Sequence, residues 1–262
     1  MTALRALVRK ELAVLFASPV AWLTLAAIGL VTALLFFDHL RVYNQILFLF
    51  ASSTMGGFES DTVPAYVNLR DQVFLPVMET LALTLVGLVP LVTMRVFAEE
   101  RARGTDELLA TTLLTPNQIV AGKLIAAYAF IALALGLSFV YPATSIVRAG
   151  LGLPHLLAVY LGLFALGIAL ASVGLVCSAF TSSQLVAAIS AYAVAFVLYD
   201  FRWLAQFLPD AAAQAIDPLS MHLRFGAFAE GLVRGADLAY FAGYVLVAFA
   251  LCRLAHDQAR VR

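Results

Sequence analysis

Long apolar stretches, separated by short charged clusters, dominate this sequence. Four of them are Val20 to Phe37, Val73 to Met94, Leu124 to Val147 and Leu156 to Phe180. A helix needs about 20 such residues to cross the roughly 30 Å hydrocarbon core of a bilayer. The chain is 63% hydrophobic and 12% charged, whereas an ordinary soluble domain has roughly 25% charged residues. A soluble fold could not bury this much apolar surface, so the bilayer is the solvent for most of the chain.

We therefore expect an all-α, polytopic membrane protein with six transmembrane helices in a single domain, residues 1–262. The last two spans are shorter than the others. The fifth follows the polar break at Thr181–Gln184 and ends at Asp200, a length that also fits a tilted or re-entrant helix, and the sixth is Leu238 to Cys252. Arg253 can extend the sixth by snorkelling to the interface.

Residues 1–19 predict an amphipathic entry helix that lies in the membrane interface. One helical face carries apolar side chains and the rest of the helix carries charges, namely Leu4, Leu7, Val8, Leu12 and Leu15 against Arg5, Arg9, Lys10 and Glu11. Ser18 and Pro19 have the residue types of an N-cap and a first helical position. The first span ends at Phe37-Asp38-His39 without a small-residue cleavage signature, so we expect it to be retained.

The distribution of lysine and arginine predicts that both termini are cytoplasmic. With the N-terminus inside, the inner segments hold most of the cations: Arg5, Arg9, Lys10, Arg95, Arg101, Arg103, Lys123, Arg253, Arg260 and Arg262. The outer segments are longer in total but hold fewer: Arg41, Arg70, Arg148, Arg202, Arg224 and Arg234. This asymmetry is what orients spans in the membrane.

Several chemistries find no support in the sequence. The net charge is zero, which gives no basic face for a nucleic acid. Cys177 and Cys252 lack the spacing of a zinc site or a disulfide framework, and the histidines at 39, 155, 222 and 256 show no metal-ligand pairing. Gly122-Lys123 lacks the earlier glycine of a phosphate-binding loop. We expect no catalytic or metal site and no cofactor bound by this chain.

The charged segment 95–123 has the features of a structured connection between spans two and three. Gly104 can end one helix, Thr105 can cap the next, and Asp106 and Glu107 place negative charge on its first turn. That helix would continue through Leu108, Leu109 and Leu113. Thr115 and Gln118 then have capping-box spacing around Pro116, so we expect two short helices in this connection.

A series of short motifs runs through the first half of the chain in a fixed order: Lys10-Glu11-Leu12, Ser18-Pro19, Pro90, Met94-Arg95, Ala98-Glu99-Glu100-Arg101, Gly104-Thr105, Glu107-Leu108-Leu109, Thr115-Pro116 and Gly122-Lys123. In these motifs the chain resembles the membrane permeases of type-2 ABC exporters (ABC-2 type), in particular their gliding-motility-associated branch. The six-span layout with an amphipathic entry helix extends the resemblance over nearly the whole chain.

The resemblance implies that this connection contains the coupling helix, which docks into a cytoplasmic ATPase. The residues it assigns to docking are Glu99, Glu100, Arg101, Arg103, Gly104, Thr105, Asp106, Glu107, Leu108, Leu109 and Leu113. Asp106 and Thr111-Thr112 are more polar than the residues usual in the family. The alternative is that these charges only solvate a cytoplasmic loop and fix the topology.

The resemblance also implies the assembly and the location. Two permeases, either two copies or two paralogues, work with two ABC ATPase subunits that bind ATP and magnesium, and an accessory membrane or periplasmic protein is a further candidate partner. The complex exports its substrate across a bacterial inner membrane by alternating access. The outer segment 201–237 would cap the exit path. Lipids, peptides, polysaccharides and drugs all remain open as substrates.

Other readings remain beside the exporter. Glu79 lies within span two, near its outer end, where an ionisable group is a candidate functional residue, or a carboxylate that reaches the outer interface or pairs across helices. A non-transporting structural subunit of a membrane complex is one alternative function. An intramembrane peptidase is another, but the arginine it needs four residues after the second glutamate of Glu99-Glu100 is replaced by Gly104.

Overall fold

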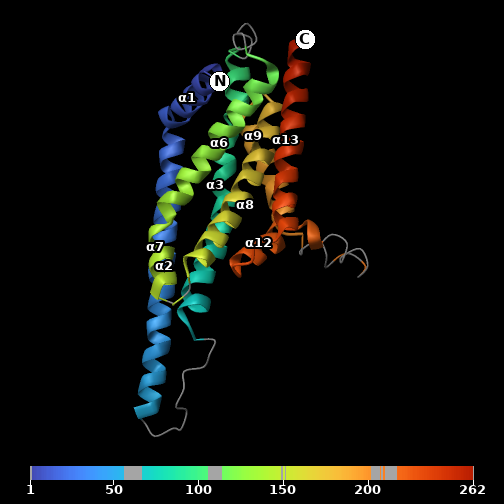
Figure 1. Cartoon of the computed structure of the whole chain (residues 1–262). Coiled ribbons are helices and arrows are strands. Elements are labelled where there is room, and N and C mark those ends of the chain that lie inside the picture. The colour runs from blue at the N-terminus through green and yellow to red at the C-terminus, as the bar shows by residue number, and fades with distance from the viewer. Residues whose placement is uncertain are drawn as a thin grey trace.

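The computed structural model describes residues 2–55, 67–105, 114–148, 150, 152–201, 207, 209 and 217–261, and these form α-helices with no strand among them. Five helical segments in this part of the chain are long and apolar enough to cross a membrane, which confirms a multi-pass, all-helical protein: Pro19–Ser52, Arg70–Ala102, Pro116–Ser138, Leu153–Ala179 and Gly235–Gln258. The expected fifth span is a helix of 16 residues, so the total of six stays a prediction. The N- and C-terminal helices meet at one end of the bundle, called the termini end below (Figure 1).

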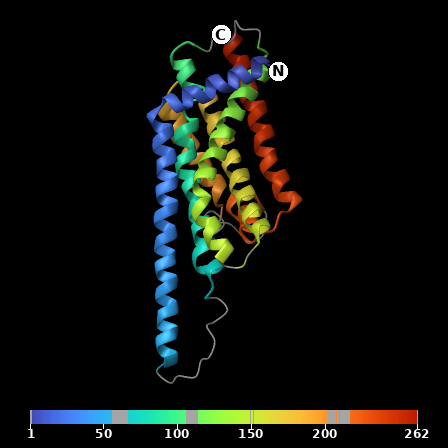
Figure 2. The same cartoon turned by 60° about the vertical axis from the view of Figure 1, so that its left-hand side comes forward.

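Two helices form the N-terminal arm, α1 (Thr2–Ala17) and α2 (Pro19–Met55). They meet at Ser18, whose Oγ accepts a hydrogen bond from the Val20 N–H at 3.2 Å, as an N-cap does. The 37 residues of α2 would extend over about 55 Å at 1.5 Å per residue. The predicted end at Phe37 is wrong, because no glycine or proline follows until after Met55. Figure 2 shows the far half of α2 projecting beyond the other helices.

The second span is continuous from a π-helical turn, η1 (Arg70–Phe74), into α3 (Leu75–Thr93), and a short helix, α4 (Ala98–Ala102), follows it. Gly104 then adopts a φ of +65°. This left-handed conformation suits glycine and ends the helix, which confirms the predicted break at Gly104.

The predicted capping box begins the third span itself, α6 (Pro116–Ser138). Thr115 Oγ1 accepts from the Gln118 N–H at 3.4 Å, and Gln118 Oε1 accepts from the Thr115 N–H at 3.0 Å. The expected second short helix is therefore wrong, because α6 continues from this start into the bundle. Its far end is interrupted before α7 (Val140–Arg148), where Pro142 cannot donate a helical hydrogen bond to Ser138.

The centre of the bundle is α8 (Leu153–Ala179), which packs against α3, α6 and three later helices, α9 (Gln184–Tyr199), α12 (Met221–Ala229) and α13 (Gly235–Val261). A 3₁₀ turn, η2 (Asp217–Leu219), precedes α12. Glycines of α8 face α12, α6 and α3, where an added Cβ would collide with Phe228, Ile131 and Thr93: these are Gly162, Gly167 and Gly174. Small residues let helices approach closely where the lipid provides no hydrophobic driving force.

Candidate functional site

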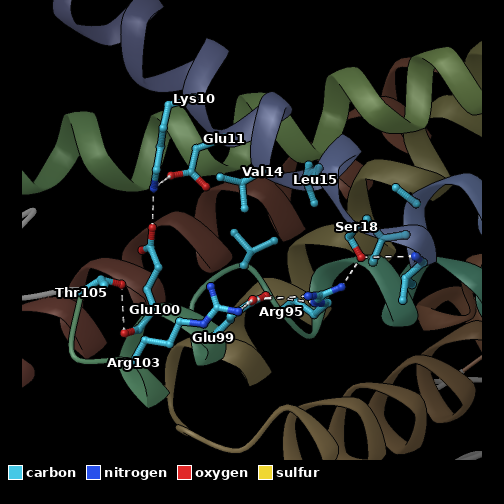
Figure 3. Close-up of a pocket in the computed structure, with 14 residues that line it drawn as sticks. Lys10, Glu11, Val14, Leu15, Ser18, Arg95, Glu99, Glu100, Arg103 and Thr105 are labelled. Carbon is cyan, nitrogen blue, oxygen red and sulfur yellow. Dashed lines mark hydrogen bonds and ion pairs between the residues drawn. The ribbon is translucent and has the colours of Figure 1, made fainter.

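Two lysines and two glutamates from α1, α4 and α6 form a closed ionic cluster at the termini end. Lys123, on the second turn of α6, is 1% exposed at its side chain, and its Nζ lies 2.7 Å from Glu100 Oε2 and 3.2 Å from Glu11 Oε2. Lys10 contacts the other oxygens of the same carboxylates, at 2.6 Å from Glu100 Oε1 and 2.9 Å from Glu11 Oε1. Each lysine therefore bridges both glutamates, and the four residues join three helices. Figure 3 shows Lys10 with its two partners, Glu11 and Glu100.

The cluster supplies a partner for each of its charges. Lys123 Nζ also donates to the Val96 carbonyl at 2.9 Å and lies 5.1 Å from the centre of the Phe97 ring. Partial burial by itself would lower the pKa of Lys10, but its hydrogen bonds to Glu100 and Glu11 outweigh burial and raise that pKa above the ordinary lysine value. A buried charge is tolerated only when it is paired and hydrogen-bonded, and Lys123 meets that condition through contacts to two other helices.

A second set of contacts fixes α4 against the junction of α1 and α2. Glu99 Oε2 lies 3.0 Å from Arg95 Nε, and Glu99 Oε1 lies 2.7 Å from Arg103 Nη2. Arg95 also donates to the Ser18 hydroxyl. The residue that caps α2 is thus tied to the segment that follows α3.

The start of α4 is held by a side chain from α8. The buried Ser178 hydroxyl accepts from the backbone N–H groups of Phe97 and Ala98, at 3.1 and 2.9 Å, and donates to the Met94 carbonyl at 2.9 Å. It therefore satisfies donors that a helix N-terminus leaves unpaired. Nearby, Arg101 Nη1 donates to the Ala179 carbonyl at 2.6 Å.

The structure brings together five of the sequence-predicted docking residues and Gly104. Glu99, Glu100 and Arg101 turn toward partners within the chain, as described above, and Arg103 is the most exposed of them, with 69% of its side chain accessible. Thr105, expected to cap a following helix, donates its backbone N–H to the Glu100 carbonyl at 3.0 Å. Asp106, Glu107, Leu108, Leu109 and Leu113 lie outside the described residues.

Glu79 is separate from this cluster. It lies on an exposed face in the second turn of α3, near the end of that helix opposite to α4. This position is compatible both with a functional carboxylate and with one that serves only to reach the interface or to pair with another helix.

Sequence reasoning missed the partners of the docking residues. Lys10, Glu11 and Lys123 were interpreted as parts of the amphipathic helix, of the charge asymmetry and of the resemblance, not as partners of the docking residues, and Ser178 was not singled out. One signal was present: Lys123 opens a long uncharged run, and a lysine carried into such a helix needs a carboxylate partner. Which glutamate would meet it depends on how the helices pack. In the part of the chain that the structure describes, no group of three or more His, Cys, Asp or Glu side chains could hold a metal ion.

Comparison with known protein families gives a match. The model of a family described as "ABC-2 family transporter protein" matches residues 5–259, nearly the whole chain. A search of the curated proteins finds no match.

Proposed function

The chain belongs to the ABC-2 family of transporter membrane proteins, and from that premise we propose that it is the permease subunit of an ABC exporter. A separate ABC ATPase, which binds ATP and magnesium, would drive it. The permease itself would be non-catalytic, and a second permease would complete the translocation path. The motifs also suggest the gliding-motility-associated branch of the family, which is part of this proposal.

The charge distribution supports a cytoplasmic location for the termini end. The cations predicted to lie inside gather there in the described residues: Arg5, Arg9, Lys10, Arg95, Arg101, Arg103, Lys123 and Arg253. Inner segments of bacterial membrane proteins carry this excess of lysine and arginine. The ATPase would therefore approach the end of the bundle that carries α1 and α4, in the bacterial inner membrane.

The Lys10/Glu11/Glu100/Lys123 cluster is the observation that carries the coupling mechanism. A partner that grips the segment after α4 can move the spans only if this segment is fixed to them. Glu100 fixes α4 to Lys123 on α6 and to Lys10 on α1, while Ser178 fixes it to α8. Packed, ion-paired elements move together rather than deform continuously, so displacement of α4 would reach the entry helix and two spans.

This arrangement refines the docking assignment. Glu99, Glu100 and Arg101 would anchor the segment within the permease, and the ATPase would contact the segment from the exposed Gly104 onward. Asp106, Glu107, Leu108, Leu109 and Leu113 would then form the coupling helix. Alternating access between the two permeases would follow from its movement.

Co-purification tests the partner. The chain is isolated from its native membrane in mild detergent, and a Glu107→Arg, Leu109→Asp double variant is compared with wild type and with Arg234→Gln, an exposed position just before α13 at the opposite end of the bundle. We expect an ABC ATPase with wild type and with the control, and its loss from a folded double variant. No ATPase with wild type under several conditions would favour the structural-subunit reading.

Coupling has its own test in reconstituted complexes. Glu100→Gln keeps the shape of the side chain but removes its charge from the cluster. We expect the ATPase to remain bound while substrate transport per ATP hydrolysed falls. An unchanged ratio would mean that the cluster serves stability alone.

A further inference from the structure

An apolar cavity lies beside the ionic cluster, between α1, the start of α2 and the end of α3 with α4. Its volume is about 420 Å³. Apart from its charged and polar residues, the cavity is lined by apolar side chains, those of Val14, Leu15, Val20, Ala21, Val92 and Val96. Figure 3 shows Val14 and Leu15 on one side of this space and the glutamates and arginines of α4 and its flanks on the other. The cavity therefore suits an amphipathic ligand, one with an apolar tail and a charged head.

The charged rim of the cavity is balanced within itself. Its cations Lys10, Arg95 and Arg103 face three carboxylates, Glu11, Glu99 and Glu100, so three positive charges meet three negative ones. The surplus positive charge lies beside the mouth, on Arg5 and Arg9 of α1, which line an adjoining hollow together with Lys10. The side chains of Lys10 and Arg103 are 45% and 69% exposed, so these are the rim cations that a headgroup can reach.

The position of the cavity matches the headgroup level of a bilayer. It lies at the start of α2, where the apolar span Pro19–Ser52 begins. Trp22, 60% exposed on the first turns of α2, donates its indole N–H to the Phe16 carbonyl at 2.9 Å. Exposed tryptophans are typical of the membrane–water interface. Arg5 and Arg9, exposed on α1 next to Lys10, add positive charge to the same surface.

We propose that this cavity binds one anionic phospholipid from the adjacent leaflet. The phosphate contacts Lys10 and Arg103, and one acyl chain enters between Val14 and Val92. Basic pockets between helices on the cytoplasmic side recognise anionic headgroups in this way. The bound lipid holds α1 against α4 from the side opposite to Lys123. The proposal rests on the membrane placement of α2 and not on the partner ATPase.

Native mass spectrometry of the purified, delipidated full-length chain tests the proposal. The protein is titrated with phosphatidylglycerol and, in parallel, with phosphatidylcholine, which has the same phosphate but no net charge. We expect a single tight phosphatidylglycerol site. Arg103→Gln is expected to weaken that site about five-fold, the equivalent of about 1 kcal/mol for one basic residue near an anionic headgroup. Arg253→Gln, which removes an exposed cation outside the cavity, leaves it unchanged.

A second variant tests the apolar walls without touching a charge. Val14 is 50% exposed and lines the cavity, so a Val14→Trp side chain can fill the space while the helix remains folded. It is expected to weaken phosphatidylglycerol binding with the rim intact. Equal binding of both lipids, or equal loss in Arg103→Gln and Arg253→Gln, would overturn the proposal. So would displacement of the lipid by the isolated ATPase subunit, which would assign the cavity to the protein partner.

Discussion

Lys123 and Glu100 form a buried ion pair, at 2.7 Å, between a membrane-spanning helix and the short helix that follows another span. Glu100 is the only carboxylate of α4 that contacts Lys10 and Lys123 among the ion pairs of the described residues. The pair is 23 residues apart in sequence, since 123 minus 100 is 23, and residues 106–113 lie between them. The ionic link from α4 to α1 and α6 thus passes through one carboxylate.

Removing the Lys123 charge should destabilise the protein strongly. In Lys123→Met, Glu11 and Glu100 lose a buried partner, and breaking a buried ion pair from one side costs about 3 to 5 kcal/mol. Unfolding in a detergent–SDS titration, followed by circular dichroism, measures the change. Adding Glu11→Gln and Glu100→Gln to the same variant should recover most of the loss, because the only cluster charge then left without a partner is Lys10, whose side chain is 45% exposed to solvent.

The matched control for this variant is Arg253→Met. Arg253 has a 53% exposed side chain and a 3.7 Å pair with Asp257, so we expect a change below about 1 kcal/mol. Equal destabilisation of both variants would contradict the role assigned to the cluster.

The Ser178 hydroxyl should determine the order of α4. In Ser178→Ala the backbone N–H groups of Phe97 and Ala98 lose their acceptor, and an unpaired buried polar group costs about 1 to 3 kcal/mol. Hydrogen exchange at these amides should become about ten-fold faster or more, since 1.4 kcal/mol corresponds to a factor of ten. Ser52→Ala, on an exposed face of α2, should leave their exchange unchanged. A slow exchange retained in Ser178→Ala would show that α4 is held by other contacts.

Gly174 should tolerate no side chain. Its added Cβ would collide with Thr93 on α3, and overpacking of a close helix contact costs about 1 to 3 kcal/mol. Gly136→Ala is the control, because no atom lies within 4 Å of a Cβ at that position of α6. We expect a clear drop in unfolding midpoint for Gly174→Ala and none for Gly136→Ala. Two equal midpoints would argue against the close α3–α8 contact.

Cysteine labelling should report opposite sides for the two ends of the bundle. In a Cys177→Ala, Cys252→Ala background, Ser52→Cys lies at the far end of α2 and Gln258→Cys at the termini end. A membrane-impermeant maleimide added to intact spheroplasts should label position 52 directly and position 258 only after permeabilisation. The reverse pattern would invert the proposed orientation.

Several elements were predictable because their causes are local. The long apolar runs and the Ser18-Pro19 and Thr115-Pro116 start signals predicted helices that the structure contains, and Gly104 ends α4 through its own backbone conformation. The end of α2 was not predictable from polarity alone. Asp38 and Arg41 end the apolar run and favour an aqueous environment there, but charged side chains do not break the backbone hydrogen bonds of the helix.

Composition, capping and charge act over a few neighbouring residues. From them alone, a membrane protein, the starts of its helices and the uneven distribution of its cations could be predicted. Which charges form pairs depends on the tertiary structure. Lys123 pairs with Glu11, 112 positions away in the sequence, and Ser178 accepts hydrogen bonds from the start of α4, about 80 positions away. A buried charge or hydroxyl demands a partner, but only the packing of the helices around the glycines of α8 selects which residue it is.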